Sequence, residues 1–212
     1  WDAAVFDAVQ TQRKLEAEAQ KEADYIRPIV LFQAQNVTER VSVHALRRHL
    51  IDELHIPAEQ VAVATGDTRE LGGVDLTAHD CPIRFIITVQ ALREGWDCPF
   101  AYALCSVQPV RSATAVEQLL GRVLRMPYAK RRAREALNKA YAHVSESHFG
   151  EAAAALADRL IQGMGFEALD VASMIAPQLP LQHCEPVVHI SKLERQDTQY
   201  APSHALLQHS AS

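Results

Sequence analysis

The amino-acid sequence predicts an α/β protein with a mostly parallel central sheet. Short, dense apolar runs such as "IVLF" (29–32) alternate with longer segments whose apolar residues recur at helical spacing. Such an alternation is typical of parallel strands covered by helices on both faces. Polar tips follow the predicted strands, as in "QAQN", "TGD", "TVQ" and "REGWD". Because ligands bind at the carboxyl ends of parallel strands, we expect these tips to gather at one edge.

The first part of the chain predicts two helices and two strands. Residues 2–25 contain neither Gly nor Pro and favour one helix, whose second half is expected to face solvent. The apolar stripe of that helix begins with Ala4, Val5, Ala8 and Val9. A buried strand is predicted within 27–35, a helix within 41–56 that ends before Pro57, and a short strand within 60–67.

The middle of the chain continues this alternation. A polar, Gly-containing loop leads to the most hydrophobic strand, "IRFIITVQ" (83–90), and "AYALCSV" (101–107) predicts another strand. A helix is predicted at about 112–126, and "KAYAHVS" (139–145) is a candidate for the last strand of the domain. These elements complete the expected α/β unit.

We expect three parts in the chain. They are an amino-terminal helix (1–26), the α/β domain (27–145) and an extension that is helical and then partly irregular (146–212). In the extension, "EAAAALADRLIQGMGF" predicts a packing helix and "PVVHISKLER" a strand or hairpin. Because the chain begins with Trp1, we expect it to be a piece of a longer protein.

Composition and charge narrow the classes of function. With 48% apolar residues the chain can build a core, and a net charge of −5 leaves only a local patch for binding a polyanion. The basic run "RMPYAKRRAR" is such a patch or a solvated helix face. The cysteines form no CxxC pair, and no apolar run reaches about 18 residues, so we expect a reduced, soluble, cytoplasmic protein without membrane contact.

The segment "AVEQLLGRVLRMP" (115–127) has an unusual polar stripe. At about 100° per residue, Gln118, Gly121, Arg122 and Arg125 fall on one side of the predicted helix. Apolar residues fall on the opposite side: Val116, Leu119, Leu120 and Val123. The helix would therefore bury its apolar face. Its other face would present to an anionic partner one amide, two guanidinium groups and, at the glycine, a position without a side chain.

Two sequence patterns follow one another along the chain, T-x6-G-x-D (Thr88, Gly95, Asp97) and Q-x-x-G-R-x-x-R (118–125). They resemble motifs V and VI of the second RecA-like domain of superfamily 2 helicases. The segments "RPIVLFQAQ" and "VAVATGD" stand where motifs IV and IVa are expected. The segments "EGWD" and "EQLLGRVLRMP" are similar to segments of the Res (motor) subunits of type III restriction enzymes and of related DEAD/DEAH-box proteins. The resemblance covers residues 1–145.

The resemblance implies a role for each nucleotide-site residue. Arg125 matches the arginine finger and Arg122 its companion, both directed to the γ-phosphate of ATP held by a first domain. Gly121 would allow close approach of the phosphates, and Gln118 stands where relatives often have His. Gly95 would allow a tight loop, and Asp97 would meet the ribose.

The resemblance also implies contacts with a nucleic-acid backbone. Thr88 matches a backbone-contacting residue, Thr65 and Gly66 are further candidates, and Gln35 is a weaker one together with Gln33. The expected partners are DNA, with RNA as the alternative, a first RecA-like domain of the same chain, and a modification (methyltransferase) subunit. ATP with Mg²⁺ would be shared with that first domain.

Structural interpretations stay open for the same residues. The two motif VI arginines could be a solvated pair, Asp97 a turn residue, Thr88 an ordinary strand residue, Thr65–Gly66 a plain turn, and Trp96 a packing residue. The whole domain could also be a non-catalytic module that clamps nucleic acid or docks a partner, and no nuclease motif is found.

Two apparent motifs are rejected. "DELH" (52–55) resembles a Mg²⁺-binding box, but it lies in a helical pattern and follows motif IV, whereas the true box precedes it. No phosphate-loop sequence occurs in the chain. "HCEPVVH" (183–189) lacks a second ligand pair at zinc spacing, so no metal site is expected.

Overall fold

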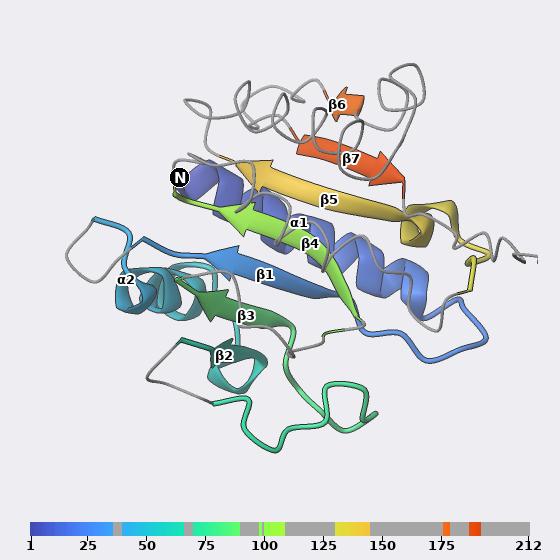
Figure 1. Ribbon diagram of the computed structural model, residues 1–212, viewed down its shortest axis with the longest axis horizontal. Coiled ribbons are helices and arrows are strands. Elements are labelled where there is room, and N and C mark those ends of the chain that lie inside the picture. Colours follow the sequence, from blue (N-terminus) through green and yellow to red (C-terminus); the bar gives the residue numbers. More distant parts are fainter. Residues whose placement is uncertain are drawn as a thin grey trace, which may run out of the picture.

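A seven-stranded sheet forms the centre of the molecule (Figure 1). The computed structural model of the chain describes residues 1–35, 40–65, 70–89, 98, 100–108, 130–144, 176–178 and 187–191. The strand order is β2-β3-β1-β4-β5-β7-β6. The strands from β2 to β5 run parallel, whereas β7 is antiparallel to both β5 and β6. The prediction of an α/β protein with a mostly parallel sheet is therefore confirmed.

The strand and helix bounds agree with most of the predicted segments. The strands are β1 (Ile29–Gln33), β2 (Val61–Val63), β3 (Phe85–Thr88), β4 (Ala101–Ser106), β5 (Lys139–Val144), β6 (Ala176–Gln178) and β7 (Val187–Ser191). The helices are α1 (Asp2–Ala19) and α2 (Val43–Arg48), followed by a π-helical turn (His49–Glu53) and 3-10 turns at Ala58–Gln60 and Glu135–Asn138. The helices predicted at 112–126 and 151–166 lie outside the described residues.

The central strand β1 is buried along its whole length. Its register aligns Leu31 with Ile86 of β3 on one side and with Leu104 of β4 on the other. Both faces of β1 are covered, which explains why its sequence is a continuous apolar run rather than an alternating one.

Helix α1 packs along β1, β4 and β5 (Figure 1). The predicted stripe is buried, but Leu15 and Ala19 are buried as well. Residues three or four apart share a helix face, so the apolar stripe continues to the end of the helix. The expectation that its second half faces solvent is therefore wrong, and the helix ends at Ala19 rather than near residue 25.

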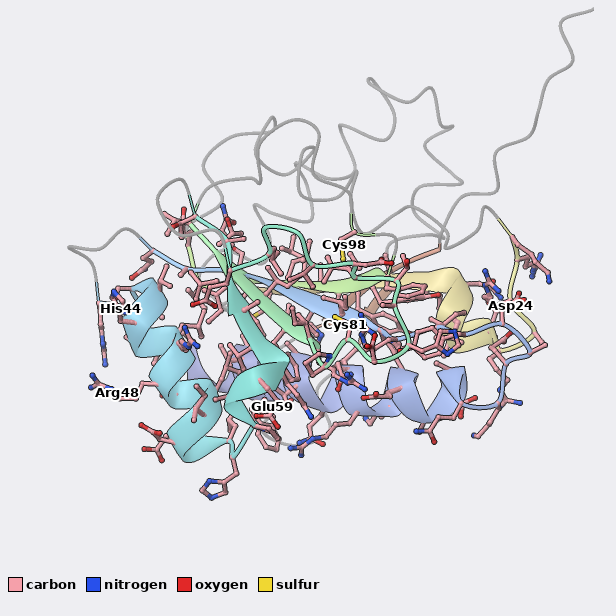
Figure 2. The ribbon with its side chains drawn as sticks, turned by 90° about the horizontal axis from the view of Figure 1, so that it is seen from below. Asp24, His44, Arg48, Glu59, Cys81 and Cys98 are labelled. Carbon is pink, nitrogen blue, oxygen red and sulfur yellow. The ribbon has the colours of Figure 1, made fainter. Side chains whose placement is uncertain are left out.

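Helix α2 lies on the same side of the sheet as α1 (Figure 2). Its first turn is capped by Ser42, whose hydroxyl accepts a hydrogen bond from the Ala45 N–H at 3.4 Å. The helical path continues through His49–Glu53, and Asp52 and Glu53 are exposed on it. Asp52 and Glu53 of "DELH" thus lie in a helical turn, as the helical pattern predicted, and not in a strand.

Antiparallel strand β7 lies within the segment "PVVHISKLER" for which a strand or hairpin was predicted. Strand β6 was not predicted, because its sequence "APQ" has no alternating pattern and contains a proline. Among the described residues, Cys81, Cys98 and Cys105 are buried. None of the described helices is long and apolar enough to cross a membrane.

Candidate functional site

The carboxyl ends of β3, β1 and β4 lie side by side. Gln33, the last residue of β1, is in register with Thr88 of β3 and with Ser106 of β4. Strand β2 extends the same edge, because its Val63 is aligned with Ile87 of β3. The polar tips "QAQ" and "TVQ" therefore begin at one edge of the sheet, where ligands of such sheets bind.

Gln33 and Ser106 form a buried polar pair at this edge. The Ser106 hydroxyl lies 2.9 Å from the side-chain oxygen of Gln33 and 3.2 Å from the carbonyl oxygen of Gln108. A serine has one hydroxyl hydrogen, so it donates to one of these acceptors at a time. The side-chain oxygen of Gln33 is therefore engaged inside the protein.

The Gln35 side chain forms hydrogen bonds with two segments that lie next to the end of β1. Its side-chain Nε2 donates to the Val107 carbonyl at 3.2 Å, and its Oε1 accepts from the Val41 N–H at 2.9 Å. Its own N–H also donates to the Val41 carbonyl at 2.9 Å. This half-buried amide therefore ties the beginning of α2 and the end of β4 to β1.

The two predicted threonines occupy the same edge but differ in exposure. Thr88 is 2% exposed, and its carbonyl accepts from the Ala34 N–H at 2.7 Å. Thr65 follows β2 and is half-buried. Thr65 is therefore the more accessible of the two to a ligand at this edge.

Sequence reasoning missed Gln108. This half-buried residue follows β4, and its side-chain Nε2 donates to the carbonyls of Ala34 and Val89, the latter at 2.9 Å. One amide thus connects the ends of β1 and β3 with that of β4. An amide directly after a buried strand, as in "SVQP", was the available signal, the same signal that selected Gln33 and Gln35.

The remaining predicted site residues lie outside the described residues. They are Gly66, Gly95, Asp97, Gln118, Gly121, Arg122 and Arg125. Within the described part of the chain, no group of three or more His, Cys, Asp or Glu side chains is arranged to hold a metal ion.

Three cations in the described end of the basic run form ion pairs at the opposite edge of the sheet, where Arg132 is buried and Lys130 and Arg134 are exposed. Lys130 and Arg132 contact the Asp24 carboxylate at 3.1 and 2.7 Å (Figure 2), and the Arg134 guanidinium contacts Glu18. Hydrogen bonds from Lys130 and then Arg132 lower the pKa of Asp24 below its usual range. These three cations therefore have acidic partners within the domain.

Comparisons with known proteins give a local sequence match. The chain matches no protein-family model. Over 52 residues it is 42% identical to the type III restriction-modification enzyme EcoPI Res subunit of Escherichia phage P1, and equally to the EcoP15I Res subunit of Escherichia coli. The match covers 24% of this chain and 5% of each Res subunit, so the chain spans a small part of the relatives it matches.

A solved structure is also similar to the chain. It is that of the S. cerevisiae Dbp5 C-terminal domain bound to Gle1 and IP6, with a TM-score of 0.40 and 16% sequence identity. The alignment covers 78% of this chain and 82% of that chain.

Proposed function

We propose that the chain is the second motor domain of an ATP-dependent superfamily 2 helicase or translocase of the Res-like kind. The observation that carries the proposal is the 42% identity over 52 residues with two type III Res subunits. The parallel sheet, with polar residues at the carboxyl ends of neighbouring strands, is an architecture suited to this role.

In this proposal the nucleotide lies between this domain and a first motor domain. Arg125 and Arg122 approach the γ-phosphate, where a planar guanidinium stabilises the charge that spreads over the phosphoryl oxygens in the transition state. Gly121, Gln118, Gly95 and Asp97 line the same nucleotide. ATP and Mg²⁺ would be held chiefly by the first domain.

Nucleic acid would lie along the exposed part of the carboxyl edge. Thr65 and Gly66 contact the phosphates, and Gln35 contributes from the end of β1. Thr88 is buried, so its contribution is expected through the backbone of the segment that it begins rather than through its hydroxyl. Contacts of this kind position a strand without reading its sequence. DNA is the proposed partner, with RNA as an outcome of the test below and a modification subunit as a further partner.

The test is the variant Arg125→Ala in the full-length protein that carries this domain. ATP binding should stay close to wild type, because the first domain supplies most of the nucleotide contacts. Turnover should fall by about 10³-fold or more, as for the loss of other arginine fingers. Arg131→Ala is the matched control, because Arg131 is exposed and its contact with the exposed Glu135 carboxylate is long, at 3.8 Å. Normal turnover by Arg125→Ala would refute the assignment.

A further inference from the structure

Gln108 occupies a junction where three strand ends meet. Its side-chain amide donates to the Ala34 carbonyl, just after β1, and to the Val89 carbonyl, just after β3. Its own backbone continues β4, two residues beyond Ser106. Among the side-chain amides with hydrogen bonds described above, Gln108 is the one that donates to residues after two other parallel strands.

The backbone of Gln108 is fixed as well as its side chain. Its N–H donates to the Ser106 hydroxyl at 3.3 Å, and that hydroxyl lies within hydrogen-bonding distance of Gln33 at 2.9 Å. Gln108 therefore cannot shift without breaking contacts to β1, β3 and β4 together. A side chain held in this way physically connects the three strand ends, which is the kind of network that can carry coupling between sites.

The three strand ends lead to different parts of the proposed site. Val89 opens the segment that carries Gly95 and Asp97, and Gln108 itself opens the segment that carries Arg122 and Arg125. Thr88, proposed to act at the nucleic-acid contact, immediately precedes Val89. One amide thus joins the end of β3, which carries Thr88, to the start of the arginine-bearing segment.

We propose that Gln108 is a positioning residue that couples nucleic-acid binding to ATP hydrolysis by holding the ends of β1, β3 and β4 in one arrangement. The inference rests on the proposed motor function and deepens it. Gln108 does not touch either ligand in this scheme. It acts through the carbonyls of Ala34 and Val89, so its loss should uncouple the two segments.

The test compares Gln108→Glu and Gln108→Ala in the full-length protein. Glutamate keeps the length of the side chain but places an oxygen where the amide donates to two carbonyls, and alanine removes the group altogether. Gln20→Glu is the control, because Gln20 is exposed just after α1 and undergoes the same chemical change. The measured quantity is the ratio of ATP turnover with saturating single-stranded DNA to turnover without it.

Both Gln108 variants should lower this ratio by about fivefold or more, the lower end of typical coupling between two sites. Partial unfolding lowers both rates equally and leaves the ratio unchanged, so a merely structural role predicts a normal ratio. If the wild type is stimulated and both variants keep its ratio, the inference fails while the motor function stands. If the wild type is not stimulated by DNA or RNA, the motor function fails and the inference fails with it.

Discussion

At the scale of single residues, the polar side chains at the strand ends are already engaged with one another. Gln33 and Ser106 pair inside the protein, and Gln35 uses both ends of its amide to brace neighbouring segments. The sequence could select these amides as candidates because they follow buried strands. It could not reveal which of them hold the edge together, since that depends on which strands become neighbours in the sheet.

Arg27 is a charged residue buried below the sheet edge, at 1% exposed. Its guanidinium donates to the carbonyls of Leu76, Ala78 and Ile83 and to the Tyr25 hydroxyl. The chemistry of guanidinium, with five donors in a planar fork, suits three carbonyls of one loop. Nothing in the run "YIRPIV" distinguishes this residue from a surface arginine.

Replacing Arg27 by Met should destabilise the protein by about 2–3 kcal/mol, because buried carbonyls lose their donor while the volume is retained. Chemical denaturation measures the change in the free energy of unfolding. The exposed Arg48, labelled in Figure 2, provides the control Arg48→Met, which should stay within about 0.5 kcal/mol of the wild type. Equal stabilities of the two variants would show that the buried guanidinium is not needed for the loop.

At the scale of elements, the end of α1 and the segment before β5 form an ion-pair cluster, which consists of Glu18, Asp24, Lys130, Arg132 and Arg134. The Arg134 N–H also donates to the Glu22 carboxylate at 2.6 Å. The acidic segment that follows α1 therefore lies against the basic run. From the sequence alone the basic run remained a solvated face or a local patch, since its partners lie more than 100 residues away.

The stabilising effect of Asp24 should depend on pH in a defined direction. Its pKa is lowered from 3.8 by Lys130 and Arg132, so the stabilisation is present above that value and is lost as the pH falls through the lower pKa of the folded state. Calorimetry should show a lower Tm for Asp24→Asn than for the wild type at pH 7 and 5, and a smaller difference at pH 3.

The variant Asp52→Asn is the control for this experiment, because Asp52 is exposed after α2 and outside the cluster. Its Tm should follow that of the wild type at pH 7 and 5. A difference for Asp24→Asn that is the same at all three values would indicate lost packing rather than lost charge.

The apolar runs predicted the described parallel strands within a few residues. A strand that is buried on both faces needs apolar residues at nearly every position, and such a run is visible in the sequence. Helix ends and the short strand β6 were less predictable. The composition of 20–24 still favours a helix although α1 ends at Ala19, and β6 depends on pairing with β7. Elements with a distinctive composition of their own could thus be predicted from the sequence, whereas an element such as β6, which depends on pairing with another strand, could not.

At the scale of the whole molecule, the two edges of the sheet differ in character. The amino edge is bound by Arg27 and by the ion-pair cluster, while the carboxyl edge presents Thr65, Gln35 and the starts of the motif segments. In the proposed motor, such a fixed edge would let the domain move as one body when a nucleotide closes the cleft with a first domain.

The proposed motor function requires an ATPase that depends on nucleic acid, and the rate of ATP hydrolysis by the full-length protein measures that dependence. The rate should be measured without nucleic acid and with saturating single-stranded DNA, double-stranded DNA or RNA. We expect a rate that rises at least about fivefold with one of these polymers, in line with typical coupling between two sites. A rate that is the same with and without every polymer, in a protein that binds ATP, would contradict it.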